Sequence, residues 1–436
     1  MSVLWTNGLF WAISLAFILI TSLISGSYPA FYLSSFNPVK VLKGTFQAGR
    51  FAALPRKVLV VVQFTVSVAL IIGTIIVYRQ IQHAKNRPVG YSREGLLMVQ
   101  IKSPDLREKF DLLARELKEQ NIISAISRSA SPLTGIWSNN GGFEWTGKDP
   151  NKVDGFGTIW ITHDYGKTVG WQFKEGRDFS KQFATDSIST QNDESIPYSI
   201  VINEAAVKYM GLKRGEGEVI KWNNQPLKVI GVIKDMILES PYEPTRHVVY
   251  LVNDGRADSW INLKLQPDIS ASAALPKIEA VFKKLVPAVP FDYKFADTEY
   301  AYKFAAEERI GKLASVFATL AVLISCLGLF GLASFMAEKR AKEIGIRKVL
   351  GATVYNLWRM LSKDFVVLVI ISCFIAVPFT YYLLQQWLQK YEYRTNISWW
   401  VFALAIGGAL LITLLTVSFQ AVKAALANPV KSLRTE

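Results

Sequence analysis

The sequence predicts an integral membrane protein, with an α-helical bundle of five transmembrane spans and a large α+β extracytoplasmic domain. Half of the 436 residues are hydrophobic, and the mean hydropathy is positive. Long apolar runs lie at both ends of the chain, around a polar middle. A soluble chain of this length would carry polar residues through most of its segments. These observations therefore favour a membrane protein.

Five segments are long and apolar enough to cross about 30 Å of hydrocarbon, and none contains a charged residue. A buried core helix is the alternative for one such run. Five runs of about twenty residues with charged flanks are instead typical of membrane spans. The predicted spans are Leu9–Leu33, Val58–Tyr78, Leu313–Met336, Phe365–Leu388 and Trp399–Val422.

The net charge of +14 is concentrated in short segments beside these spans. Between Lys85 and Arg309 about thirty basic residues are balanced by about thirty acidic ones, so the polar middle is neutral and predicts no nucleic-acid partner. Lysine and arginine in short loops mark the cytoplasmic side of a membrane. This rule places residues 40–57, the connection 338–363 and the C-terminal tail in the cytoplasm, and residues 81–310 outside.

A short motif occurs twice, each time just after an apolar span. Residues 37–43 read Asn-Pro-Val-Lys-Val-Leu-Lys, and residues 428–434 read Asn-Pro-Val-Lys-Ser-Leu-Arg. Asparagine and proline end a helix, and the basic residues hold that end in the cytoplasm. We therefore interpret residues 1–44 as the last span of a preceding repeat unit and residues 45–57 as a cytoplasmic basic linker. The chain would then be the second half of a longer, duplicated protein.

The polar block, residues 81–310, mixes strand and helix patterns, which predicts an α+β fold. Apolar runs predict strands near 96–101, 122–127, 157–162, 199–202, 227–233, 247–252 and 260–265. One helix is predicted from the N-cap Ser103 through Leu117, and another from the N-cap Asn203 to Gly211. The helical pattern from Asp297 runs into the third span, which predicts a continuous stalk helix.

The sequence carries no motif for catalysis or cofactor binding. His83, His163 and His247 are far apart and lack neighbouring ligands, and both cysteines lie in apolar runs. There is no phosphate-binding loop, nucleophile elbow or zinc-protease motif. The residues therefore predict neither enzymatic activity nor a bound metal or cofactor.

The connection 338–363 after the third span carries the clearest signal. Its pattern predicts an extension of the span, a break at Gly345, and a short amphipathic helix that ends near Gly351. Ile344, Val349 and Leu350 are expected to be buried, and the cations to be exposed. Composition and spacing leave two interpretations open, a basic segment that attracts anionic lipid and a helix that docks a partner.

Residues 342–352, Lys-Glu-Ile-Gly-Ile-Arg-Lys-Val-Leu-Gly-Ala, resemble the "REIGIxRALGA" signature of FtsX-like permeases, the membrane subunits of MacB-like ABC transporters. Residues 202–206 and 229–235 resemble motifs of the MacB-like periplasmic core domain, and the resemblance covers about residues 56–436. It implies a span at 58–80, a periplasmic core domain with stalk at 81–310, and a three-span FtsX-like domain at 311–436. The residues that it assigns to ATPase coupling are Glu343, Ile344, Gly345, Ile346, Arg347, Lys348, Leu350 and Gly351.

This resemblance implies a permease in a bacterial inner membrane, with its large domain in the periplasm. A separate ABC ATPase subunit would hydrolyse ATP, and a second permease unit would complete the transporter as a homodimer partner or a fused repeat. The extra first span and the repeated motif resemble the double-length permeases of Bacteroidetes-type bacteria. Such machines expel peptides or extract lipoproteins by mechanotransmission. The alternatives are a non-transporting sensor or scaffold whose outer domain binds an envelope ligand, and a membrane-tethered enzyme.

Overall fold

The computed structural model describes residues 7–34, 54–151, 154–188 and 196–426. It divides into two compact units, Met1–Val60 and Val61–Glu436, which are described separately. Both copies of the Asn-Pro-Val-Lys motif and most of the 45–57 linker lie outside the described residues. The hypothesis of a preceding repeat unit therefore stays a prediction.

Among the described residues, four helices are long and apolar enough to cross a membrane, and they coincide with four of the five predicted spans. They are α3 (Leu54–Lys85), α10 (Ala305–Lys339), α12 (Val354–Leu388) and α13 (Trp399–Leu426). The first predicted span is helical, as α1 (Gly8–Ser34). Its described apolar stretch, Gly8–Leu23, is shorter than a span, so its crossing of the membrane stays a prediction.

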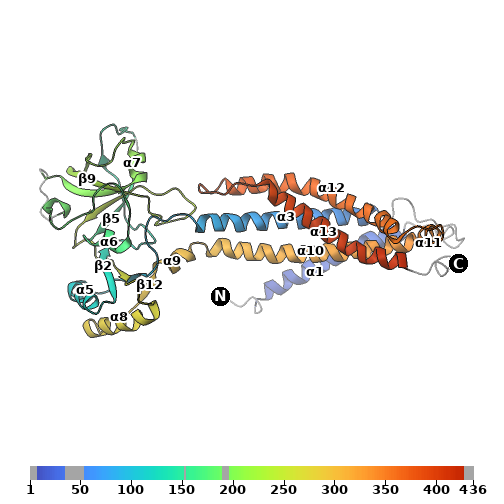
Figure 1. Cartoon of the computed structure of the whole chain (residues 1–436), viewed down its shortest axis with the longest axis horizontal. Coiled ribbons are helices and arrows are strands. Elements are labelled where there is room, and N and C mark those ends of the chain that lie inside the picture. The colour runs from blue at the N-terminus through green and yellow to red at the C-terminus, as the bar shows by residue number, and fades with distance from the viewer. Residues whose placement is uncertain (1–6, 35–53, 152–153, 189–195, 427–436) are drawn as a thin grey trace. The chain divides into compact units, whose positions relative to one another are not determined.

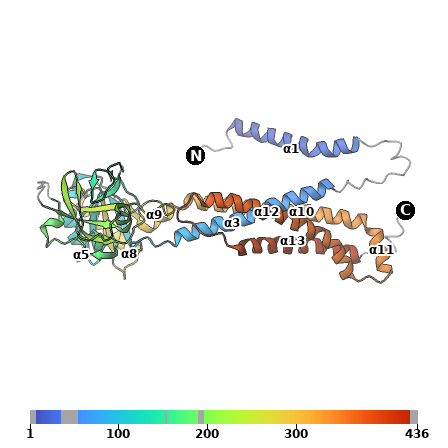
Figure 2. The same ribbon diagram turned by 90° about the horizontal axis from the view of Figure 1, so that it is seen from above.

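Polar contacts join the four helices within the second unit, where they run side by side (Figures 1 and 2). The hydroxyls of Ser67 on α3 and Ser325 on α10 are 3.0 Å apart. The hydroxyl of Ser372 on α12 donates to the carbonyl of Val61 at 3.1 Å. Such bonds hold membrane helices together because lipid offers no competing partner.

The domain between α3 and α10, residues 86–304, is built on a 12-stranded sheet and is called the sheet domain below. All seven predicted strands are present, together with five short ones that the sequence pattern did not indicate, β3, β4, β6, β8 and β12. The strands are β1 (Leu96–Gln100), β2 (Ile123–Ser129), β3 (Asn139–Asn140), β4 (Phe143–Glu144), β5 (Phe156–Ile161), β6 (Phe173–Gly176), β7 (Tyr198–Asn203), β8 (Val219–Trp222), β9 (Gln225–Ile233), β10 (Val248–Val252), β11 (Trp260–Leu265) and β12 (Tyr293–Phe295).

The strand order is β12-β1-β11-β2-β5-β10-β7-β9-β8-β4, with β3 on β5 and β6 on β9. The pairs β5–β10 and β7–β9 are parallel, and the other pairs are antiparallel. The sheet domain also contains the 3-10 helix η2 (Ala184–Asp186) and the helices α4 (Pro104–Glu108), α5 (Phe110–Glu119), α6 (Tyr165–Val169), α7 (Glu204–Met210), α8 (Ala271–Leu285) and α9 (Ala296–Tyr302). Helices α5 and α8 pack on β1, β2 and β11 through a core that includes Leu113, Leu117, Ile278 and Phe282. This mixture is the predicted α+β fold.

The predicted helix caps are present, but one predicted helix is broken. Ser103 Oγ accepts from the Leu106 N–H at 3.3 Å and begins α4, and Asn203 Oδ1 accepts from the Ala206 N–H at 3.1 Å and begins α7. The helix expected from Ser103 to Leu117 ends and restarts at Lys109, with φ −89° and ψ 9°. The Lys109 ammonium donates to the carbonyl of Leu285 at the end of α8, 2.8 Å away, and this long-range contact anchors the corner.

The expectation of a continuous stalk helix is wrong. Helix α9 ends at Tyr302, a turn of two residues follows, and α10 begins at Ala305. At this turn the Lys303 ammonium donates to the carbonyls of Leu238 and Glu239 at 2.6 and 2.5 Å. Phe304, which is 1% exposed, is buried in the core of the sheet domain. The turn directs both side chains into the sheet domain, which a straight helix would not do.

Candidate functional site

The predicted coupling segment forms a separate short helix, α11 (Ala341–Val349), between α10 and α12. The predicted break at Gly345 is wrong, because the chain turns at Arg340, between α10 and α11, and Gly345 lies buried inside α11. At the corner, Arg340 Nη2 pairs with Asp364 Oδ2 of α12 at 2.9 Å. This ion pair fixes where the chain turns.

One side of α11 is packed against the bundle. Ile344 is 4% exposed and forms a small core with Leu357 and Leu361 of α12 and Ala421 of α13. Beside this core, Trp358 Nε1 donates to Ser418 Oγ at 2.7 Å and joins α12 to α13. Burial of an isoleucine side chain stabilises a fold by about 1.5–3 kcal/mol. Helix α11 is therefore attached to the bundle through this contact.

The end of α11 is set by backbone hydrogen bonds that need glycine. The N–H of Ala352 donates to the Arg347 carbonyl at 2.9 Å, and that of Gly351 donates to the Lys348 carbonyl at 3.1 Å. These are the two bonds of a Schellman motif, whose penultimate residue is left-handed. Gly351 has φ +90°, so the predicted helix end at this residue is confirmed. Thr353 then begins α12 by accepting from the Asn356 N–H at 3.3 Å.

The opposite side of α11 presents an apolar surface with no partner in the described part of the chain. Ile346 is 52%, Val349 67% and Leu350 80% exposed, and these three residues are called the apolar stripe. At 100° per residue, these three side chains lie on the face of the helix opposite Ile344. The expectation that Val349 and Leu350 are buried is therefore wrong, because packing of Ile344 turns them outward.

Charged residues border the apolar stripe. Glu343 Oε1 and Arg347 Nη2 form an ion pair at 2.8 Å, one turn apart. Arg347 also reaches α12, with Nη1 2.9 Å from the sulfur of Met360, and Lys342 is exposed. Of the predicted coupling residues, Ile344 and Gly345 are buried, Ile346 and Leu350 form part of the stripe, and Glu343 and Arg347 flank it. Lys348 is partly buried and Gly351 ends the helix.

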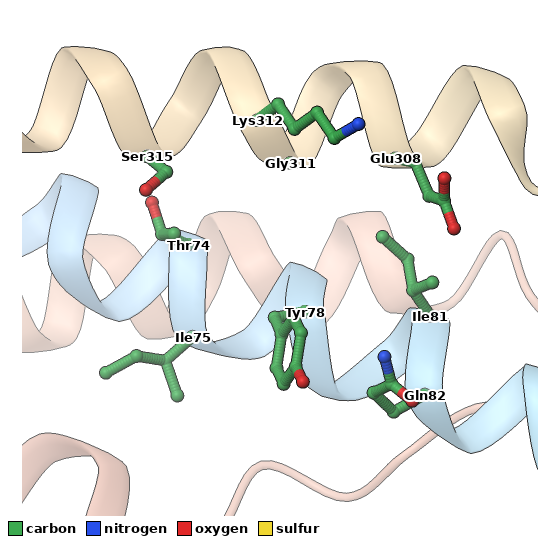
Figure 3. Close-up of a pocket in the computed structure, with 9 residues that line it drawn as sticks. All are labelled: Thr74, Ile75, Tyr78, Ile81, Gln82, Glu308, Gly311, Lys312 and Ser315. Carbon is green, nitrogen blue, oxygen red and sulfur yellow. The ribbon is translucent and has the colours of Figure 1, made fainter.

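A groove of about 490 Å³ lies between α3 and α10 near their sheet-domain ends, and no sequence pattern indicated it. It lies between the Ser67–Ser325 contact and an ion pair that joins Lys85 to Glu308. Figure 3 shows α3 and α10 facing each other across it. The two helices are therefore fastened at two points with open space between them. The groove is lined by Thr74, Ile75, Tyr78, Ile81, Gln82, Glu308, Gly311, Lys312 and Ser315.

Within the described residues, no three His, Cys, Asp or Glu side chains gather in an arrangement that could hold a metal ion. The titratable groups with shifted pKa values in the sheet domain mostly serve its packing. Burial, for example, raises the pKa of the Asp235 carboxyl, which accepts from the Ala205 N–H at 2.8 Å.

Two family models match the chain. The model of the MacB-like periplasmic core domain matches residues 58–281, and the model of the FtsX-like permease C-terminal domain matches residues 315–429. The first matches about half of the chain.

Two curated relatives align with half of the chain. The macrolide export ATP-binding/permease protein MacB of Aggregatibacter actinomycetemcomitans is 24% identical over 231 residues, which cover 50% of this chain and 33% of MacB. The uncharacterized ABC transporter permease YknZ of Bacillus subtilis (strain 168) is 27% identical over 240 residues, which cover 50% of this chain and 57% of YknZ. The chain thus spans between a third and just over half the length of these relatives.

Solved structures of isolated outer domains also match. The periplasmic region of MacB from Actinobacillus actinomycetemcomitans is 16% identical with a TM-score of 0.31, and the match covers 48% of this chain and 92% of that one. The extracellular domain of the YknZ transporter from Gram-positive bacteria is 12% identical with a TM-score of 0.30, and the match covers 46% and 97%.

Proposed function

Because the chain belongs to the family of ABC transporter permeases that combine a MacB-like periplasmic core domain with an FtsX-like permease domain, we propose that it couples ATP hydrolysis in a separate subunit to movement of its sheet domain. The chain itself would bind no ATP and no other cofactor. The work done would be export or extraction of a peptide, a lipoprotein or a similar envelope substrate by mechanotransmission.

The apolar stripe on α11 carries this proposal. Ile346, Val349 and Leu350 are more than half exposed, and the charged side chains of Glu343 and Arg347 border them. Burial of each such side chain in an interface contributes up to about 1.5–3 kcal/mol, and clustered apolar anchors with a charged rim are typical of binding hot spots. We propose that the stripe inserts into a groove of the ATPase and that Glu343, Arg347 and Lys348 set the register.

The contacts of α11 support transmission of movement into the bundle. Ile344 packs on α12 and α13, and the Arg340–Asp364 pair ties the corner of α10 to α12. Helices α10 and α12 have 35 residues each and so extend about 50 Å. A force on the apolar stripe would therefore displace the adjacent ends of α10 and α12, and these long helices would carry the movement toward the sheet domain.

The charge pattern supports the proposed topology. Lys339, Lys342, Arg359 and Lys363 lie around α11, which favours a cytoplasmic position for this end of the bundle and contact with anionic lipid. The sheet domain then lies in the periplasm of a cell whose inner membrane holds the bundle. A second permease unit, as a homodimer partner or a fused repeat, would complete the transporter.

Coupling can be tested with two leucine substitutions of equal size. Leu350→Ala and Leu327→Ala remove the same atoms from side chains that are 80% and 72% exposed, but Leu327 lies within the α10 span. The tagged chain is purified from its native membrane with any P-loop ATPase that accompanies it. The ATPase rate of the complex is then measured in nanodiscs.

We expect Leu350→Ala and Arg347→Ala to reduce recovery of the ATPase and its stimulation, while Leu327→Ala leaves both unchanged. Equal recovery and equal rates for all three variants would contradict the docking role. A purified chain with no ATPase in any preparation would instead favour the sensor or scaffold.

A further inference from the structure

The loop between α12 and α13, residues 389–398, does more than connect two helices. A solvated connection would make few contacts outside its own ends. This loop instead contacts α3 and the sheet domain at the same time, through the backbone and the rings of Tyr391 and Tyr393. It is called the bridging loop below.

Gln80 holds the bridging loop to α3. Its Nε2 donates to the Tyr393 carbonyl at 2.9 Å, and its Oε1 accepts from the Thr395 N–H at 2.8 Å. The amide is 1% exposed, so both bonds are shielded from water. One turn along α3, the His83 ring stacks on Tyr393 with 4.3 Å between ring centroids.

Tyr242 holds the same loop to the sheet domain. Its carbonyl accepts from the N–H groups of Glu392 and Tyr393 at 3.2 and 3.3 Å. Its ring contacts Tyr391, with 5.0 Å between centroids, and Phe304 at the start of α10, with 5.7 Å. Because Tyr242 is only 7% exposed, this part of the sheet domain is enclosed by the loop and α10.

Arg87 joins the two halves of this contact. Its guanidinium lies 4.6 Å from the ring centroid of Tyr393 and donates to the carbonyls of Pro241 and Glu243 at 3.0 Å. One side chain, two residues after the end of α3, thus touches both the bridging loop and the segment that carries Tyr242. Separation of the bridging loop from this segment would therefore remove one of these two contacts of Arg87.

We propose that the bridging loop is a latch that fastens the sheet domain to α3, so that displacement of α12 reaches the sheet domain without passing through α10. This inference rests on the proposed function for the origin of the displacement, since Ile344 of α11 packs on Leu357 and Leu361 of α12. The latch itself is a property of the chain alone. It gives the sheet domain a third attachment, beside its covalent connections to α3 and α10.

The latch is tested with matched glutamine substitutions. Gln80→Leu keeps the size of the side chain and removes both bonds to the loop. Gln386→Leu is the control, because in the described part of the chain Gln386 Nε2 donates to Tyr382 Oη, at 2.7 Å on the exposed surface of α12, and not to the bridging loop. Gln80→Glu retains an acceptor for the Thr395 N–H and should restore part of the contact. His83→Ala is a milder variant in case Gln80→Leu fails to fold.

The measurement is the distance distribution between spin labels at Asp268 of the sheet domain and Asn396 of the loop, both exposed. The full chain is used in nanodiscs, with Cys326 and Cys373 replaced by serine. We expect one narrow distance for wild type and Gln386→Leu, a broad distribution for Gln80→Leu and His83→Ala, and an intermediate one for Gln80→Glu. An unchanged narrow distribution in folded Gln80→Leu and His83→Ala would overturn the latch.

A second arm separates this inference from the proposed function. If an ATPase co-purifies, ATP with vanadate should shift the wild-type distance between labels at Asp268 and Leu327, and Gln80→Leu should reduce that shift. An equal shift in wild type and Gln80→Leu would overturn the latch and leave the proposed function intact. If no ATPase is present in any preparation, the proposed function fails, and the nucleotide-free distances still decide whether the loop holds the sheet domain.

Discussion

Replacement of Gly351 by alanine should loosen the end of α11 by a calculable amount. Gly351 has φ +90°, and no atom lies within 4 Å of the position that a Cβ would take. The cost is therefore conformational rather than steric, about 1–2 kcal/mol for a left-handed alanine. Since about 1.4 kcal/mol is a factor of ten, the helix end should open roughly 5- to 30-fold more often.

Hydrogen exchange on the full chain in nanodiscs measures this opening. The N–H groups of Gly351 and Ala352, which bond to the carbonyls of Lys348 and Arg347, should exchange faster in Gly351→Ala. Gly351→Asn should fall between wild type and alanine, because asparagine tolerates positive φ. The control is Gly331→Ala, which also adds a Cβ in open space but inside α10, where alanine favours the helix by up to about 1 kcal/mol. Equal protection at residues 351 and 352 in wild type and Gly351→Ala would refute the reasoning.

Three further substitutions test the sheet domain and its junction. Gly90→Ala would place a Cβ 2.2 Å from the Asp235 carbonyl oxygen at φ +79°, so we expect a loss of about 3 kcal/mol or more, measured as a fall in the thermal unfolding midpoint. Burial alone would raise the pKa of the Asp186 carboxyl, but hydrogen bonds, first from Arg177, hold it below its ordinary value. The stabilisation that Asp186 contributes should be complete above the ordinary pKa of an aspartate, and it should be lost as the pH falls through the lowered pKa of the folded state. Asp186→Asn should therefore remove this pH dependence of the thermal unfolding midpoint. Burial lowers the pKa of Lys303 from the ordinary 10.5 to about 8. Between these two values the unfolded chain binds more protons at this residue than the folded chain, so the free energy of unfolding should rise with pH across this window. A thermal unfolding midpoint that rises just as much with pH in Lys303→Met would contradict this.

Elements whose cause is local could be predicted from the sequence. Uncharged runs of about twenty residues indicated α3, α10, α12 and α13, and apolar runs indicated the seven longer strands. The caps at Ser103 and Asn203 follow from side chains that bond within three residues. Strands β3 and β4 have two residues each, which is too short for any periodicity, and only their partner strands define them.

Elements whose cause is distant in the chain could not be predicted. Helix α10 ends at Lys339, and the next side chain, that of Arg340, bonds to Asp364, 24 residues later. Asp186 stands among polar residues, a pattern typical of a solvated loop, but its side chain is fully buried against Arg177. At the candidate site, the signature indicated the segment, but exposure of Val349 and Leu350 depends on how Ile344 packs against α12 and α13. The periodicity of the sequence alone does not determine how α11 is rotated about its own axis.

The most direct test of ATPase docking is site-specific photo-crosslinking in intact native membranes, with the photoreactive residue placed at Leu350 or, as the control, at Leu327. Both side chains are largely exposed, at 80% and 72%, but only the first belongs to the apolar stripe. We expect Leu350 to crosslink to a protein whose peptides include a P-loop sequence, and Leu327 to give no such product. Crosslinks from Leu350 to lipid alone, or to the same proteins as Leu327, would contradict the docking of an ATPase on α11.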